Sequence, residues 1–240
     1  MKTYGKRAPG GIPRVRARGQ KPVFRLFPEN FLERLAGAFR SPLLLLLFLT
    51  AFLSPQLPSF SVASEILFVT IDGVINPVTA DFLDDAIKRA HSKKAGALVV
   101  ELDTPGGLDS SMREMIKDIL SSEVPVVVFV GPAGSRAASA GVFITYAASV
   151  AAMAPGTNIG SAHPVSMAGK MDEVMSKKVE NDAVAYLKGI AAKRGRNAEW
   201  AEKAVRESVN VTAEEALKLG VIDMLASTRE ELIAKLDGVK

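Results

Sequence analysis

The stretch that decides the fold is ILFVTIDGVI, residues Ile66–Ile75. It is short, rich in β-branched residues and nearly uncharged, which is typical of a strand buried on both faces of a parallel sheet. Two runs of the same kind follow it, ALVVEL at Ala97–Leu102 and VPVVVFV at Val124–Val130. The three runs predict three strands of one sheet.

The segments between these runs have helical periodicity. Residues 76–92 place four apolar side chains on one predicted face, namely Val78, Phe82, Ala86 and Ala90. Residues 110–121 do the same with Met112, Met115, Ile116 and Ile119. Strands alternating with amphipathic helices predict an α/β fold, with a parallel sheet and right-handed crossovers.

The C-terminal half continues in the same style. Residues Met171–Arg194 form a predicted long helix. A capping box at Thr212–Glu215 opens a short helix that Gly220 closes. A last strand is expected at Val221–Leu225 and a last helix at Arg229–Leu236. With no internal repeat, residues 64–240 are predicted to form a single domain.

The N-terminal region has the pattern of an export signal. Residues 1–40 hold ten Lys and Arg against two Asp and Glu. The uncharged run Leu43–Leu53 follows, and its eleven residues would reach only about 16 Å as a helix, about half of a bilayer core. Ser61-Val62-Ala63 then supplies small residues before a cut. We expect residues 1–63 to be a basic tail plus signal peptide, either cleaved or retained as an anchor, and the body to be exported.

The composition excludes several classes of function. After residue 40 the chain holds 20 Lys and Arg against 24 Asp and Glu, so the pI of about 9.3 reflects the tail and does not indicate nucleic-acid binding. There is no Cys, which excludes a disulfide framework and a thiol nucleophile. Only two His are present, without acidic residues at metal-ligand spacing, so neither a metal nor another cofactor is expected.

Two loops after predicted strands could carry chemistry, because open α/β sheets bind ligands at the carboxyl ends of their strands. The first is DTPGG, Asp103–Gly107, whose paired glycines would let backbone N–H groups approach an oxyanion. The second is GSRAASAG, Gly134–Gly141, in which small residues surround Ser139. From this pattern alone Ser139 is either a nucleophile or the N-cap of a buried helix.

Five motifs in one order identify a family that the chain resembles. They are DTPGG, ASAG, AMAPGTNIGSAHPV, AYLKGIAAKRGRN and VTAEEALKLGVID, and the resemblance they carry covers about residues 66–227. The chain is similar to the membrane-associated ClpP-class serine proteases of the NfeD family. This resemblance implies a ClpP/crotonase-like fold, with repeated β-β-α units and a mainly parallel sheet flanked by helices.

The resemblance also implies a Ser-Lys dyad. Carried over by position, the nucleophile is Ser139 and the general base is Lys178, with the oxyanion held by the Gly106-Gly107 loop and the N–H of Ala140. A lysine accepts a proton only while neutral, so a base of this kind needs a pKa below the usual value of about 10.4. Lys178 lies beside Val179, at the margin of the long helix's apolar face.

His163 is the alternative base. ClpP itself uses a Ser-His-Asp triad, and His163 follows Ser139 by 24 residues, close to that spacing. The third member would fall at Ser208, which has no carboxylate, and the neighbouring Glu207 would point elsewhere. A histidine without an orienting carboxylate is a weaker base, since nothing fixes its tautomer. We therefore expect Lys178 to be the base and His163 to shape the pocket.

Other functions remain open. One is acyl-CoA chemistry on the crotonase fold, and another is a catalytically idle protein that only binds membrane-protein tails. The resemblance implies a peptide or membrane-protein substrate such as a stomatin-like protein, a homo-oligomer, and a periplasmic or other extracytoplasmic, membrane-associated location. Because many members of the family continue into membrane helices, the chain is expected to be a short form or a truncated product.

Overall fold

The computed structural model describes residues 65–166, 169 and 172–237. The basic tail, the apolar run Leu43–Leu53 and the expected cut after Ala63 lie outside the described residues, and so does the predicted domain boundary. Among the described residues, no helix combines the length and the apolar character needed to cross a membrane.

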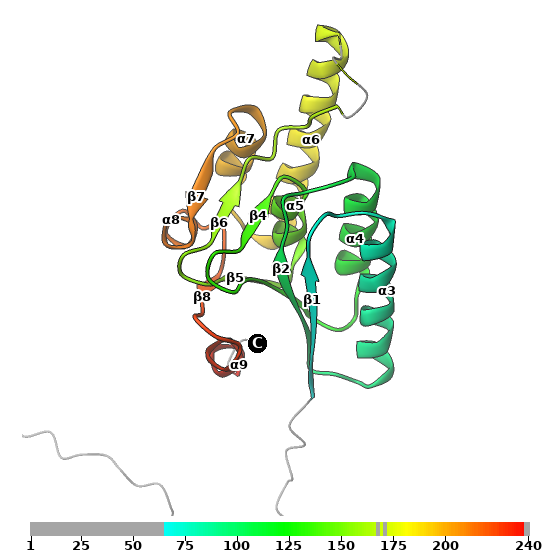
Figure 1. Cartoon of the computed structure of the whole chain (residues 1–240), viewed down its shortest axis with the longest axis vertical. Helices are drawn as coiled ribbons and strands as arrows, with labels where there is room; N and C mark the ends of the chain where they lie inside the picture. The colour runs from blue at the N-terminus through cyan, green and yellow to red at the C-terminus, as the bar shows by residue number, and fades with distance from the viewer. Residues whose placement is uncertain (1–64, 167–168, 170–171, 238–240) are drawn as a thin grey trace, which may run out of the picture. The chain divides into compact units, whose positions relative to one another are not determined.

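A five-stranded parallel sheet forms the centre of the body (Figure 1). Its strands, in spatial order, are β1 (Ile66–Asp72), β2 (Ala97–Asp103), β3 (Val126–Val130), β5 (Val150–Met153) and β8 (Met224–Leu225). The three predicted strands are therefore confirmed as neighbours. β3 begins at Val126, two residues later than the sequence run, because Pro125 has no N–H to donate to a ladder.

Alternate residues of the strands face two separate cores. Val126, Val128 and Val130 belong to the larger core. This core also contains the buried faces of the helices that follow β1, β2 and β4 (Arg136–Ala138). Val127 and Phe129 point to the opposite side, where Leu232 of the last helix covers them. The sheet is thus covered on both faces, as an all-parallel sheet requires.

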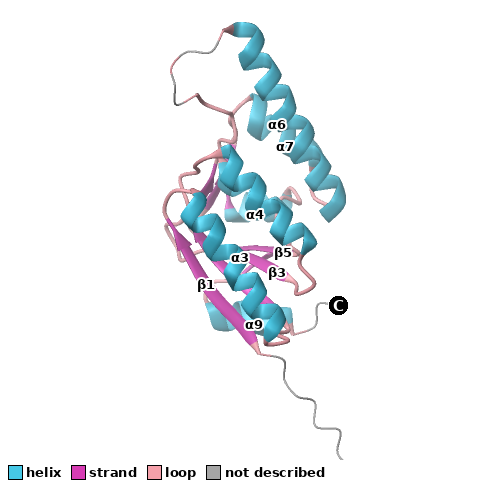
Figure 2. Ribbon diagram, turned by 90° about the vertical axis from the view of Figure 1, so that its right-hand side faces the viewer, coloured by secondary structure: helices cyan, strands magenta, loops and turns pink. Residues whose placement is uncertain are grey.

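The helices that the sequence predicts lie close to their expected positions. Figure 2 shows the helices of the body in cyan. They are α3 (Pro77–Ser92), α4 (Asp109–Ser121), α5 (Ala140–Ala147), α6 (Glu173–Arg194), α7 (Ala198–Arg206), α8 (Ala213–Lys218) and α9 (Arg229–Leu236). The capping box of Thr212 and Glu215 at α8 is confirmed. α7, whose buried face includes Trp200 and Val205, was not predicted from the sequence.

The predicted face of α3 was partly wrong. Val78 and Phe82 are 75% and 45% exposed, whereas Ala80 and Leu83 are buried with Ala86 and Ala90. The two larger side chains have the i, i+4 spacing of a core face. The side chains of α3 that face the sheet are nevertheless those one or two positions later in the sequence, Ala80 and Leu83.

A second sheet of three short strands adjoins the main sheet, because its strand β4 packs against β2. It consists of β4 (Arg136–Ala138), β6 (Asn158–Gly160) and β7 (Asn210–Thr212). β4 falls inside the segment predicted as a loop before Ser139.

The predicted last strand, Val221–Leu225, is shortened to β8. Asp223 lies in the part of the predicted strand that precedes β8, and its carboxylate accepts the N–H of Ala151 at 2.7 Å.

Candidate active site

Ser139 lies at the junction of β4 and α5 in a strained backbone conformation. Its φ is 53° and its ψ is −112°, a region that residues with a Cβ rarely adopt. Although Ser139 is the N-cap residue of α5, its side chain makes no capping hydrogen bond. Its N–H donates to the Gly160 carbonyl at 3.0 Å, which ties the residue to β6. The hydroxyl is thus held in place by the backbone and is not used to cap the helix.

The DTPGG loop lies directly against Ser139. Gly106 has a φ of 111°, and a Cβ placed on it would come within 2.6 Å of the Ser139 Cβ and 3.1 Å of its Oγ. Thr104 connects the two loops through its backbone. Its N–H donates to the Arg136 carbonyl at 2.8 Å, and its own carbonyl accepts the Ala138 N–H at 3.0 Å. The two loops singled out from the sequence are therefore brought together.

Gly107 packs against the backbone of Ile75. The Ile75 N–H donates to the Gly106 carbonyl, and the Leu108 N–H donates to the Ile75 carbonyl, both at 2.9 Å. In such a parallel bridge the middle residue, Gly107, directs its own N–H away from Ile75. The N–H of Ala140, at the start of α5, likewise precedes the first intrahelical hydrogen bonds. Both groups have the character of oxyanion donors.

Gly107→Ala is expected to destabilise the fold by about 3 kcal/mol, because its Cβ would lie 2.0 Å from the Ile75 carbonyl oxygen. Gly189→Ala, in α6, is the control: nothing lies within 4 Å of the added carbon, so helix propensity should stabilise the protein by up to about 1 kcal/mol. Denaturant unfolding of both variants measures the difference. Equal stabilities would mean that the Gly107 turn can shift to make room.

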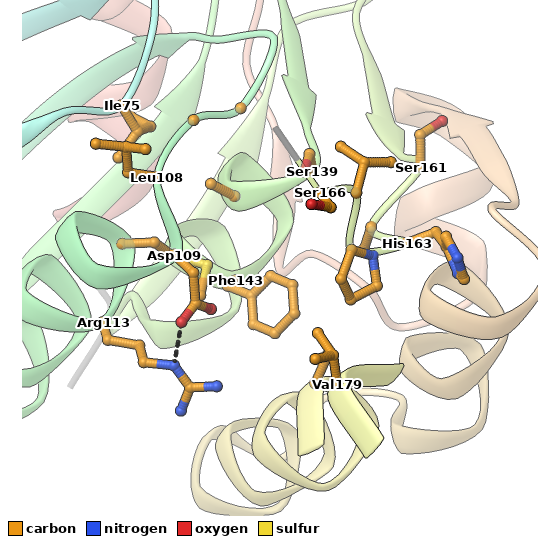
Figure 3. Close-up of a pocket in the computed structure, with 18 of the residues that line it drawn as sticks. Ile75, Leu108, Asp109, Arg113, Ser139, Phe143, Ser161, His163, Ser166 and Val179 are labelled. Carbon is orange, nitrogen blue, oxygen red and sulfur yellow. Dashed lines mark hydrogen bonds and ion pairs between the residues drawn. The ribbon is translucent and has the colours of Figure 1, made fainter. Parts of the chain in front are cut away.

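A cavity of about 1200 Å³ opens in front of Ser139 (Figure 3). Its wall is largely apolar and is built from the β1–α3 loop, the DTPGG loop, α4, α5 and α6. Ile75, Leu108, Phe143 and Val179 contribute apolar side chains to it. The cavity is large enough for several residues of an extended peptide.

Lys178 lines the same cavity, from the second turn of α6. One end of this helix projects beyond the rest of the body (Figure 1). The side chain of Lys178 is exposed, and no hydrogen bond or ion pair joins it to another described residue. The helix is capped by Asp172, whose side chain accepts the Met175 N–H. Lys178 is therefore the sixth helical residue, beyond the first turn where the helix dipole acts most strongly. Lys177, in contrast, does not line the cavity.

His163 is partly buried and is oriented by a backbone group. Its Nδ1 lies 2.9 Å from the Val205 carbonyl, which can only accept, so Nδ1 carries the proton and donates. The expectation that nothing fixes the tautomer of His163 was therefore wrong. Figure 3 shows the ring turned toward α7 and away from Ser139. A carbonyl thus occupies the place where a triad would need a carboxylate.

A cluster of three charged side chains at the cavity, those of Asp109, Arg113 and Asp182, was not predicted from the sequence. Arg113, on α4, binds Asp109 one turn before it and Asp182 on α6. The i, i+4 spacing of Asp109 and Arg113 is a sequence signal for an ion pair. The partner on α6 has no such signal, since it lies 69 residues further on.

The described residues hold no cluster of three His, Asp or Glu side chains placed as metal ligands.

Comparison with known proteins places this geometry in a family. The family model described as "NfeD1b, N-terminal domain" matches residues 65–238. The membrane-bound protease PH1510 of Pyrococcus horikoshii is 40% identical over 182 residues, covering 74% of this chain and 41% of that protein. The membrane protein NfeD1b of Bacillus subtilis is 26% identical over 206 residues, covering 80% and 46%. The chain spans less than half of the length of either relative.

Solved structures show the same fold. A serine-to-alanine mutant of the 1510-N membrane-bound stomatin-specific protease is 37% identical, with a TM-score of 0.69 over 74% of this chain and 86% of that one. A lysine-to-alanine mutant of the same protease, in complex with a substrate peptide, gives 37% and 0.70 over 75% and 83%. ClpP1 from Listeria monocytogenes, at 20% identity and 0.55 over 72% and 94%, shares the fold. The expected ClpP-like fold is confirmed.

Proposed function

The chain belongs to the NfeD1b N-terminal domain family, and we propose that it is a serine endopeptidase with Ser139 as nucleophile and Lys178 as general base. The observation that carries the proposal is Ser139 itself. Its hydroxyl makes no capping hydrogen bond to α5, and its backbone is strained. The residue lies between the DTPGG loop and a cavity that Lys178 also lines. The relative's serine and lysine mutants, the latter with a bound substrate peptide, support the same residue types.

The first step forms an acyl-enzyme. Ser139 Oγ attacks the carbonyl carbon of the scissile peptide bond while neutral Lys178 Nζ accepts the hydroxyl proton. The negative charge that develops on the carbonyl oxygen is held by the N–H groups of Gly107 and Ala140, next to the Gly106 turn. Each such donor typically lowers the barrier by about 3 kcal/mol.

The second half of the reaction releases both products. The C–N bond breaks as Lys178 returns its proton to the leaving amine, and the new N-terminus departs. Lys178, neutral again, then takes a proton from water, whose oxygen attacks the ester carbon. The C–O bond to Ser139 breaks, and the hydroxyl recovers its proton. Every transfer runs through one amine, so the reaction needs no other base.

The cavity favours apolar peptide segments. Its wall is largely aliphatic and aromatic, and the side chains of Val74 and Leu108 at the cavity are partly exposed, 54% and 39%. We extend the proposal to membrane-protein segments such as stomatin-like tails, which the name of the 1510-N relative supports. Assembly into a homo-oligomer belongs to the same proposal, and the exposed Val78 and Phe82 of α3 support it.

A fluorophosphonate probe tests the proposed function, since it reacts with an activated serine and spares an ordinary one. We expect one adduct on the full chain, mapped to Ser139 by mass spectrometry. A folded chain that takes up no probe would favour an idle binding protein or acyl-CoA chemistry over a peptidase.

Export of the body is proposed from the charge pattern of residues 1–63 and from the names of the two relatives, one membrane-bound and one a membrane protein. The chain recovered from its host is expected to begin at Ser64, in an extracytoplasmic or periplasmic, membrane-associated fraction. N-terminal sequencing makes the measurement. A chain that keeps Met1 and pellets with membranes would show an anchor instead of a cleaved signal.

A further inference from the structure

Arg113 links the two sides of the candidate site through its charge. Its Nε donates to Asp109 Oδ2 at 2.8 Å, and a terminal nitrogen of the same guanidinium donates to Asp182 on α6. Asp182 lies one helical turn after Lys178, and both side chains line the cavity. Figure 3 shows Arg113 paired with Asp109 at the cavity wall.

An aromatic contact continues this connection to the helix of Ser139. The Arg113 guanidinium lies 4.3 Å from the centre of the Tyr186 ring, and Tyr186 stacks on Phe143 with ring centres 6.1 Å apart. Phe143 lies one turn after Ser139 on α5. The side chain of Arg113 therefore touches α6 at Asp182 and Tyr186, the two turns that follow Lys178.

We propose that Arg113 is a positioning residue for the reaction: it sets α6, and with it Lys178, relative to Ser139, and it neutralises Asp182 so that this carboxylate does not stabilise the ammonium form of Lys178. This inference rests on the proposal that Lys178 is the general base. Two carboxylates already pair with the Arg113 guanidinium, so its positive charge is compensated within the protein.

The charges around Lys178 support the electrostatic part. The charged residues near it on α6 are Glu173, Lys177, Glu180 and Asp182. The charged residues on the side of α4 are Asp109 and Arg113, and the titratable residues on the side of α7 are His163 and Arg206. Glu180 is paired with Arg206, as Asp182 is with Arg113. Without Arg113, the unpaired Asp182 would lie at i+4 from Lys178, a spacing that favours the charged amine.

The guanidinium keeps its charge at this place. Partial burial opposes the charged form, but the hydrogen bonds and charges of Asp109 and Asp182 outweigh it, so the pKa of Arg113 is raised. Arg113 therefore stays a cation throughout the pH range in which a lysine base would work.

The test measures the neutral fraction of Lys178 directly. The full chain is labelled with trinitrobenzenesulfonate, which attacks only neutral amines, and modification of Lys178 is followed by mass spectrometry against pH. Arg113→Met should raise the pH of half-maximal labelling by about 0.3, the size of an exposed i, i+4 interaction. Asp182→Asn should lower it by a similar amount, because it removes a negative charge and leaves Arg113 in place.

Opposite signs separate this role from a merely structural one. Both substitutions break the same ion pair, so a helix that was only loosened would respond in the same direction to each. Arg206→Met is the matched control, since Arg206 also joins a residue of α6 to a second carboxylate, on the other side of the helix. The control should leave the labelling of Lys178 unchanged.

Kinetics add a second readout. Arg113→Met should lower kcat about tenfold with KM within twofold, because substrate binding is kept while the base is misplaced. Arg113→Lys should restore the labelling pH but not kcat, since an ammonium cannot bridge two carboxylates and stack on Tyr186 as the planar fork does.

Several results would overturn the inference: shifts of the same sign in Arg113→Met and Asp182→Asn, or no difference between Arg113→Met and Arg206→Met. If Arg113→Met does not fold, Asp182→Asn decides alone, since Asp182 is 66% exposed and the change is isosteric. Labelling does not depend on catalysis. A chain that lacks peptidase activity therefore overturns the proposed function, while the labelling shifts still report on Arg113.

Discussion

Ser139→Ala is expected to abolish peptide hydrolysis, lowering kcat by at least about 10³-fold, and to end fluorophosphonate labelling without loss of fold. The hydroxyl makes no capping bond to α5, and the Cβ and backbone of alanine occupy the same positions. The loss should therefore be chemical and not structural. Hydrolysis of an apolar peptide, probe labelling and thermal unfolding of the same preparation are the measurements.

Ser92→Ala is the matched control for this substitution. The Ser92 hydroxyl is exposed and donates to the Arg89 carbonyl at the end of α3, away from the cavity. It should keep full activity and labelling. Persistent labelling of Ser139→Ala at Ser161, which also lines the cavity, would move the nucleophile to that residue.

The parallel sheet could be predicted because its strands are defined by local sequence. Runs such as Val126–Val130 are buried on both faces and carry almost no polar residue, which few other structures tolerate. That the DTPGG loop and the Gly134–Gly141 segment lie on the same side of the molecule also followed from position, since each comes after a predicted strand of the parallel sheet. The short strand β4 of the second sheet, which lies between β3 and Ser139, was not predicted.

Other features of the site could not be predicted because they depend on the packing of distant elements. The Val205 carbonyl that orients His163 belongs to α7, 42 residues further on, and a backbone carbonyl leaves no mark in the sequence. The strained φ of Ser139 could not be predicted either, since a serine in the sequence does not indicate a positive φ. A glycine does indicate that a positive φ is available, and Gly106 was accordingly identified with its loop as a candidate.

The exposed position of Val78 and Phe82 shows the same limit on a helix face. Their i, i+4 spacing predicted burial, but periodicity fixes only the relative direction of side chains around the axis. The rotation of α3 about that axis is set by contacts of Ala80 and Leu83 with the sheet. When the apolar residues cover a wide arc of the helix, the pattern therefore predicts the helix correctly but not which residues lie at the middle of its buried face.

Lys178→Ala is expected to lower kcat nearly as far as the serine substitution, because the two members of a catalytic unit act together. Lys177→Ala provides a closely matched control: the same residue type, on the same turn and also exposed, but outside the cavity lining. It should keep wild-type activity. Equal losses in the two variants would point to α6 stability and not to proton transfer, and thermal unfolding would separate these causes.

His163→Ala should keep substantial activity, since the ring is turned toward α7 and away from Ser139. The pH profile gives an independent check of the base. A lysine acts only when deprotonated, so activity should rise through alkaline pH, whereas an unperturbed histidine base would produce its rise near pH 6.5. An inactive His163→Ala beside a fully active Lys178→Ala would replace the dyad with a Ser139-His163 pair oriented by a backbone carbonyl.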